Sequence, residues 1–235
     1  MTKTPASRRP SRPATPPARK ATTPVRTAAP QTPPKRRFPI ALVVGGVLAI
    51  ALVAVIVLTM SKGQDGAALE VGTPRVTGEA LARFESPETD TALGLPIPEV
   101  SGADFDGTLV SITRDGRAKM IVFVAHWCAV CQQEVPIIMD WLPGATIPAG
   151  VDLYSVSAGV DRSRPNYPPS AWLDREGWTV PLIMDDDAGS IAAAYGLSAY
   201  PYFVFVNAAG NVVGRLTGGM PAETIASLVA QLGGA

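Results

Sequence analysis

Two cysteines, Cys128 and Cys131, supply the clearest chemistry in this sequence. They are the only cysteines among 235 residues, and they stand together in Trp127-Cys128-Ala129-Val130-Cys131. The C-x-x-C spacing lets the two sulfurs close a disulfide within one helical turn, which is typical of redox proteins. The pattern predicts a Cys128–Cys131 pair that performs thiol–disulfide exchange, in which a thiolate is the attacking form.

The stretches on either side of the cysteines predict how they are positioned. Lys119 to Ala125 is a nearly continuous apolar run, expected for a strand at the centre of a covered sheet. A helix is predicted from the cysteines to about Trp141, interrupted by Pro136. This junction places Cys128 at a helix N-terminus, where the helix dipole and free N–H groups favour a thiolate.

The rest of the C-terminal region alternates between strand and helix patterns. Such alternation, closed by a hairpin and a helix, predicts an α/β domain. The expected elements are a hairpin turn at Asp106-Gly107, a strand at Val151–Ser157, a Pro-rich loop at 160–170, a helix at Ala171–Glu176, a strand at Val180–Met184, a helix at Asp187–Tyr195 opened by Asp185-Asp186-Asp187, a hairpin of Tyr202–Val206 with Val212–Leu216, and a helix at Pro221–Leu232.

Composition divides the chain into four parts. Residues 1–37 hold ten Lys or Arg, nine prolines and no acid, so they predict a disordered basic tail. Residues 38–60 are apolar and uncharged. Residues 61–93 are polar and predict a linker, with a short helix near 79–84. Residues 94–235 have the size of one domain, and residues 38–235 carry 10 basic and 20 acidic side chains.

The apolar run Phe38–Met60 predicts a membrane anchor. Its 23 residues would span roughly 34 Å as a helix, enough for a bilayer core. A cleaved signal peptide is the rival interpretation, but its apolar core is about 7–15 residues. Lys35-Arg36-Arg37 lies just before the run. The positive-inside rule therefore predicts a single-pass cell-membrane protein with a cytoplasmic tail and residues 61–235 outside, with no nucleic-acid partner.

Several motifs follow one another in the C-terminal region. They are the lead-in from Leu95 to Gly107, the run Ala125-His126-Trp127-Cys128-Ala129-Val130-Cys131, the continuation Gln132-Gln133-Glu134-Val135-Pro136, and the stretch from Asp185 to Val204. In this order they resemble the TlpA/ResA-like family of membrane-anchored thiol:disulfide oxidoreductases. The resemblance covers roughly residues 94–233 and implies a thioredoxin-like fold, a central mixed sheet flanked by helices, behind a single N-terminal transmembrane helix.

The resemblance implies a role for each candidate residue. Cys128 is the expected nucleophile and Cys131 the resolving thiol. Glu134, one helical turn after Cys131, is expected to accept its proton, although a solvated helix glutamate is an equal alternative on spacing alone. Trp127 is expected to form a wall of the site.

Pro201 is the expected cis-proline, with the backbone of Tyr200 pairing with the substrate chain. The family commonly has a small residue in place of Tyr200. His126 either tunes Cys128 or, as we favour, is solvent-facing in the loop.

The sequence therefore predicts an enzyme that reduces disulfides in substrate proteins, for example during cytochrome c maturation or thiol maintenance. It would receive electrons from a transmembrane thiol carrier and needs no cofactor. Two cysteines and the single His126 do not supply the four ligands of a structural zinc site. Two alternatives stay open: an oxidase for exported proteins, and a membrane-tethered docking or chaperone module with a structural disulfide.

Overall fold

The computed structural model of the protein describes residues 69–234. The predictions for the tail at 1–37, the anchor at 38–60 and the first part of the linker at 61–68 lie outside these residues. Within residues 69–234, no helix combines the length and the apolar content needed to cross a membrane.

The described residues form an α/β domain whose elements alternate as the sequence predicts. In chain order the elements are β1 (Arg75–Thr77), a 3-10 turn at Pro87–Thr89, β2 (Glu99–Ala103), β3 (Leu109–Ile112), β4 (Ala118–Val124), α2 (Ala129–Trp141), a 3-10 turn at Leu142–Gly144, β5 (Val151–Ser157), α3 (Pro169–Arg175), β6 (Leu182–Met184), α4 (Ser190–Ala194), β7 (Tyr202–Val206), β8 (Val212–Thr217) and α5 (Ala222–Leu232).

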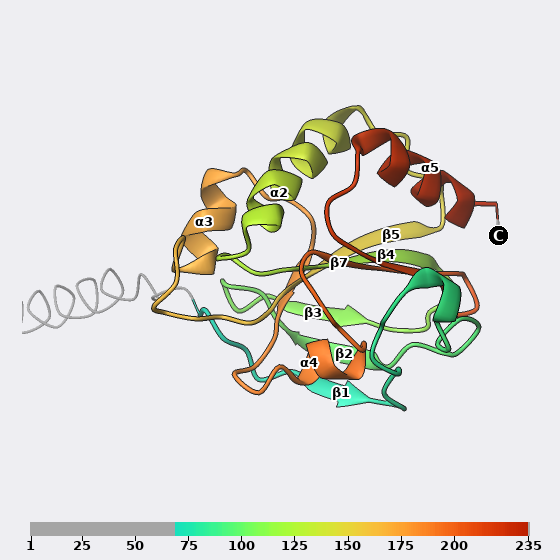
Figure 1. The fold of residues 1–235 in the computed structure, drawn as a ribbon, viewed down its shortest axis with the longest axis horizontal. Coiled ribbons are helices and arrows are strands. Elements are labelled where there is room, and N and C mark those ends of the chain that lie inside the picture. The colour runs from blue at the N-terminus through green and yellow to red at the C-terminus, as the bar shows by residue number, and fades with distance from the viewer. Residues whose placement is uncertain (1–68, 235) are drawn as a thin grey trace, which may run out of the picture. The chain divides into compact units, whose positions relative to one another are not determined.

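A mixed five-stranded sheet forms the centre of the domain (Figure 1). Its strand order is β6-β5-β4-β7-β8. Strand β4 runs parallel to β5 and antiparallel to β7, so both its long edges are paired. All seven residues of β4 are buried, which confirms the predicted central strand. The mixed sheet flanked by helices confirms the thioredoxin-like part of the predicted fold.

Alternate residues of β4 face two separate cores. Met120, Val122 and Val124 pack with the buried residues of α2, α3 and α5. Ile121 and Phe123 pack on the opposite face, against α4, the strands β2 and β3, and the segment from Leu81 to Ala92. Because side chains alternate across a strand, a continuous apolar run is needed to fill both cores. Figure 1 shows α2 and α5 on one side of the sheet and α4 with β1–β3 on the other.

Residues 69–93 belong to this domain, which corrects that part of the predicted linker at 61–93. Strand β1 pairs with β2, and β2 pairs with β3, in a second sheet of three antiparallel strands. Leu81 and Phe84 are buried in the second core, and their N–H groups donate to the carbonyls of Ala194 and Gly196. The predicted short helix at 79–84 is wrong, because these residues are extended over the domain. Leu81 and Phe84 are two isolated buried side chains among polar residues, so they leave no periodic apolar pattern in the sequence.

A buried ion pair locks this segment onto the sheet. Arg215 of β8 makes a bidentate contact with Asp90, and both side chains are almost fully buried. Nη1 of Arg215 also donates to the carbonyls of Ala82 and Tyr195. Burial alone raises the pKa of Asp90, but hydrogen bonds and the charge of Arg215 outweigh burial and hold that pKa below its ordinary value. The guanidinium of Arg215 therefore connects β8 with the C-terminal end of α4 and with the segment from Ala82 to Asp90.

Three predicted element boundaries also need correction. Helix α2 is one continuous helix with Pro136 inside it, not a helix interrupted there. Strand β6 and helix α4 are shorter than the predicted 180–184 and 187–195. Asp185 and Asp186 use their carboxylates on backbone N–H groups at the start of α4, so the acidic cluster opens that helix as predicted.

We predict that the Asp90–Arg215 pair is a major determinant of stability. Asp90→Ala leaves the guanidinium of Arg215 buried without a counter-charge, so the free energy of unfolding should fall by about 3–5 kcal/mol. Urea denaturation of the purified protein measures this. The control is Glu99→Ala, which removes a partly exposed partner of Arg114 and should cost less than about 1 kcal/mol. Equal losses in the two variants would contradict a structural lock.

Candidate active site

The cysteines lie at the edge of the sheet where β4 ends and β7 begins. Because β4 and β7 are antiparallel, with Phe123 opposite Tyr202, the residues after β4 meet those before β7. Cys128 and Tyr200 are 72 positions apart, yet the thiol of Cys128 donates to the carbonyl of Tyr200 across 3.4 Å. The strand pairing thus brings the two predicted halves of the site together.

Cys128 is the N-cap residue of α2. Its Sγ accepts a hydrogen bond from the N–H of Cys131 at 3.3 Å, one of the free donors of the first helical turn. A thiolate at this position gains that hydrogen bond together with the positive end of the helix dipole. Cys128 retains 9% of its surface, whereas Cys131 is fully buried. Both residues are free thiols in the structure, with Cys128 the accessible one.

Cys131 lies in the core, where ionisation is disfavoured. Burial is the largest cause of a strongly raised pKa, and the nearby charges of Cys128 and Glu134 raise it further. A resolving thiol must nevertheless lose its proton before it attacks a mixed disulfide. The site therefore needs a proton acceptor near Cys131.

Glu134 is a buried carboxyl with one oxygen unused by the protein. It is 1% exposed, which excludes the alternative of a solvated helix glutamate. Its Oε2 accepts the N–H of Met220 at 2.9 Å. Its Oε1 is buried and has no hydrogen-bond partner among residues 69–234. Burial raises the pKa of Glu134, although the hydrogen bond from Met220 opposes this. A carboxyl in this state can take up and release a proton near neutral pH more readily than a solvated one.

Two aromatic side chains form a wall beside Cys128. The rings of Trp127 and Tyr200 meet edge to face, with centroids 5.8 Å apart. Nε1 of Trp127 donates to the carbonyl of Gly159 at 2.6 Å. A Cβ on Gly159 would lie 2.8 Å from the hydroxyl of Tyr200, so a glycine is needed there. The Tyr200–Pro201 bond is cis, as predicted.

His126 is buried, which corrects the prediction of a solvent-facing side chain. It is 1% exposed, and both ring nitrogens are engaged. Nδ1 lies 2.7 Å from the carbonyl of Pro165, and Nε2 lies 3.2 Å from the backbone N of Asp161. Because a backbone N–H can only donate, Nε2 must accept and Nδ1 must carry the proton. The ring is therefore neutral in this arrangement and holds a loop in place.

Several contributors to the site were missed by sequence reasoning. The backbone N–H of Met220 contacts the carboxyl of Glu134. The backbone of Gly219 also lies close to this carboxyl, since a Cβ on Gly219 would be 2.8 Å from Oε2 of Glu134. Gly159 and the 161–166 loop form the surroundings of Trp127 and His126. In the sequence, the only indication of this contact is the pair Gly218-Gly219 after a predicted strand, and such a pair usually indicates a turn.

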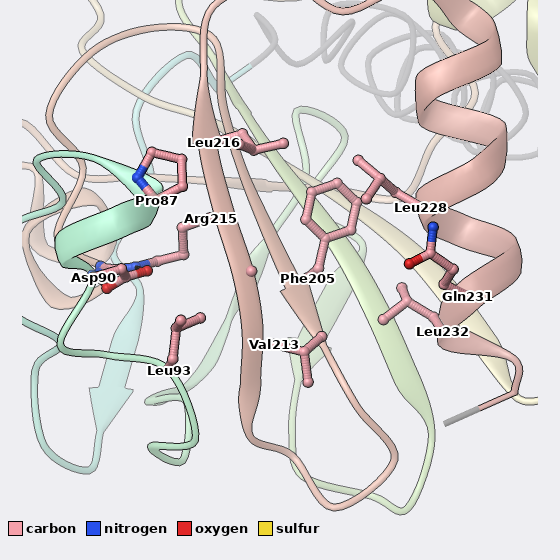
Figure 2. A pocket seen from close by; sticks show the side chains of 11 residues that line it. Pro87, Asp90, Leu93, Phe205, Val213, Arg215, Leu216, Leu228, Gln231 and Leu232 are labelled. Atoms are coloured by element: carbon pink, nitrogen blue, oxygen red, sulfur yellow. Dashed lines mark hydrogen bonds and ion pairs between the residues drawn. The ribbon is translucent and has the colours of Figure 1, made fainter.

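A separate cavity of about 390 Å³ lies between β8, α5 and the segment around Pro87 (Figure 2). The Asp90–Arg215 pair lies on one side of it, and the side chains around it are otherwise mostly apolar. None of the residues predicted to carry the redox chemistry lines this cavity. Its lining is Pro87, Asp90, Leu93, Phe205, Val213, Gly214, Arg215, Leu216, Leu228, Gln231 and Leu232.

Comparison with known proteins agrees with this geometry. The family model described as Redoxin matches residues 92–232. The chain belongs to the Redoxin family. It is 26% identical over 145 residues to the thiol-disulfide oxidoreductase ResA of Geobacillus thermodenitrificans, covering 61% of this chain and 80% of the relative. It is 24% identical over 160 residues to a thiol:disulfide interchange protein DsbE homolog of Paracoccus denitrificans, covering 66% and 84%.

A solved structure of similar fold supports the same assignment. It is a solution structure of a candidate protein disulfide isomerase from Bacteroides thetaiotaomicron, with 25% identity and a TM-score of 0.50. The match covers 65% of this chain and 91% of the other. This Redoxin family member is a thiol-disulfide oxidoreductase of the thioredoxin-like kind, and such enzymes act on proteins that carry thiols or disulfides.

We predict that Glu134 gives the protein a characteristic dependence of stability on pH. A raised native pKa means that the folded state binds more protons than the unfolded state above the ordinary value of 4.5. The free energy of unfolding should therefore fall as pH rises from there toward the native pKa. In Glu134→Gln this contribution is absent, so the variant should gain stability relative to the parent over that window.

Urea denaturation from pH 4 to pH 8 measures the difference between the two proteins. Asp140→Asn, an exposed acid on the same helix, is the control and should show no such trend. Parallel curves for Glu134→Gln and the parent would contradict a buried, proton-binding Glu134.

Proposed function

We propose that this enzyme reduces disulfides in substrate proteins outside the cytoplasmic membrane, to which Phe38–Met60 anchors it. The observation that carries the proposal is one arrangement of three groups. An accessible Cys128 caps a helix, a buried Cys131 lies one turn deeper, and the unpartnered oxygen of Glu134 lies in the same core. This arrangement suits a two-step exchange in which only the first thiol meets the substrate.

In the first step the thiolate of Cys128 attacks one sulfur of a substrate disulfide. A mixed disulfide forms between Cys128 and the substrate, and the second substrate sulfur leaves as a thiolate that takes a proton from water. The backbone of Tyr200 beside the cis-proline Pro201 would hold the substrate chain by strand addition. The Trp127–Tyr200 wall supplies flat apolar area to that chain.

In the second step Cys131 resolves the mixed disulfide. Its proton passes to Glu134, and the resulting thiolate attacks Sγ of Cys128. The Cys128–Cys131 disulfide forms, the bond from Cys128 to the substrate breaks, and the second substrate sulfur leaves as a thiolate that takes up the proton held by Glu134. Counting the proton that Cys128 released to water when it ionised, the substrate has gained two electrons and two protons, and the enzyme has lost them. A transmembrane thiol carrier would return the enzyme to its dithiol form. No cofactor takes part in this scheme.

The reducing direction is proposed from the resemblance to the TlpA/ResA-like family. Strong dithiol oxidants are those whose reduced form is stabilised, as in DsbA, whose first cysteine has a very low pKa. Burial and the charge of Glu134 oppose ionisation of Cys131, the second cysteine, so a thiolate at that position does not stabilise the reduced form. Maturation of cytochrome c or maintenance of protein thiols would supply such substrates.

The first described residues are fixed to the sheet and to α3. The backbone of Gly72 donates to the carbonyl of Asp185, just beyond the end of β6. Glu70 accepts hydrogen bonds from the backbone and the hydroxyl of Ser170 at the start of α3. Because β6 is parallel to β5 and β5 to β4, this edge of the sheet is also the one that carries Cys128. The first described residues therefore lie at the same edge of the sheet as the dithiol.

The reduction potential of the Cys128–Cys131 couple tests the proposed direction. The protein is equilibrated in defined thiol–disulfide buffers, and free thiols are tagged and counted by mass. We expect a value near that of thioredoxin, about −270 mV. A value near about −120 mV would make the enzyme an oxidase for exported proteins. Cys128→Ser, which cannot form the pair, is the control for tagging of Cys131 alone.

Cys131→Ser tests whether the cysteines work in catalysis. Without the resolving thiol the second step stops, so substrates should accumulate as mixed disulfides on Cys128 that reducing agent releases. Non-reducing gels of affinity-purified protein detect them, and Cys128→Ser provides the matched negative. Partners retained equally by both variants without covalent capture would indicate a docking or chaperone module with a structural disulfide.

A further inference from the structure

A loop that no catalytic step requires is fixed firmly beside the active site. The carbonyl of Pro165 and the N–H of Asp161 bind the two ring nitrogens of His126. Nδ2 of Asn166 donates to the carbonyl of His126 at 3.3 Å, and the Tyr167 ring meets the imidazole edge to face. His126 is two residues before Cys128, so the loop at 161–167 is placed by the same strand end as the nucleophile.

This loop carries a cation to the aromatic wall of the site. Cζ of Arg164 lies 4.4 Å from the centroid of the Trp127 ring. An exposed contact of this kind is weak, and it leaves the N–H groups at the edge of the guanidinium available. The side chain of Arg164 is exposed, and it has no hydrogen bond or ion pair with another residue in the 69–234 range.

The charges of the loop at 161–167 leave it positive. Hydrogen bonds from Ser163 and the charge of Arg164 hold the pKa of Asp161 below its ordinary value, so this residue is one negative charge near Arg164. Arg162 adds a second exposed cation, so the loop has two cations and one anion and a net charge of +1. The domain as a whole is acidic, since residues 69–234 contain nine Lys or Arg and nineteen Asp or Glu. Because charge interactions are screened beyond about 8–10 Å, a substrate at Cys128 senses the local cations more than the distant acids.

The geometry points to Arg164 as a specificity-determining residue of this oxidoreductase. Its guanidinium, held against Trp127 by the His126-bound loop, pairs with a carboxylate close to the target cysteine of a substrate protein. Arginine binds carboxylates through two parallel N–H donors, and complementary charge at a contact acts mainly on partner choice and association rate. Substrates with acidic residues beside the reactive disulfide are thus selected. This inference rests on the proposed exchange at Cys128 but not on its direction.

Two synthetic peptides with one internal disulfide test the inference. They are identical except for aspartates or lysines flanking one cysteine. The pre-reduced full-length protein is mixed in excess with each peptide, the reaction is stopped with acid, and the peptide dithiol is quantified by chromatography. We expect the second-order rate constant for reduction of the acidic peptide to exceed that for the basic peptide by about tenfold at low salt, and the ratio to shrink as salt rises.

Arg164→Gln should bring this ratio close to one, and Arg164→Lys should retain part of it. The matched control is Arg114→Gln. Arg114 lies before the first residue of β4, and the cysteines follow the opposite end of this seven-residue strand, which alone is about 23 Å long. This variant should leave the ratio unchanged. A ratio that survives in Arg164→Gln would overturn the inference. So would equal slowing of both peptides together with a shift in the pH dependence of Cys128 alkylation, because Arg164 would then act on the thiolate.

Failure of the proposed reductase function remains distinguishable. If the reduced protein reduces neither peptide, the oxidised protein is mixed with the two dithiol peptides, and the same ratio is read from disulfide formation. Selectivity in that direction would retain the role of Arg164 while removing the reductive function. Equal rates for the two peptides in both directions would overturn the role itself.

Discussion

The antiparallel pairing of β4 with β7 is the constraint on which the active site depends. It joins the end of the strand that leads to Cys128 with the start of the strand that follows Tyr200 and Pro201. The helix cap presents Cys128, but without this pairing the thiol would face solvent rather than a carbonyl and an aromatic wall. Both neighbours of β4 are needed to keep it central, and its apolar side chains on two faces are what hold it there.

The two cysteines differ in exposure because the same helix places one at the surface and the other in the core. Cys128 sits at the helix start with part of its surface exposed, and Cys131 lies one turn on, inside the core. The core that makes Cys131 inaccessible also makes its proton hard to remove, and it encloses Glu134 beside it. Burial of the carboxyl costs free energy unless its charge is neutralised. Retaining it without a partner on one oxygen is compatible with a role in moving protons.

Polar contacts at the rim have a different character. Nδ1 of His126 donates and Nε2 accepts, so the ring connects the active-site strand with the 161–167 loop. The Asp90–Arg215 pair performs the same joining function on the other side of the sheet, where it fixes the N-terminal segment. Both joints bring chain segments of low apolar content into the domain, which hydrophobic burial alone would not hold.

Local patterns in the sequence determined the chemistry and most of the framework. The apolar run before the cysteines and the alternating strands depend on neighbours within a few residues, so β4, β5, the hairpin of β7 with β8, and α5 were predicted correctly. Only the tertiary structure decided the burial of His126, the closed environment of Glu134, the position of Arg164 and the packing of residues 75–93. These features depend on contacts between segments distant in the chain, and such contacts leave no periodic trace because each is made by one or two side chains whose partner is set by strand pairing.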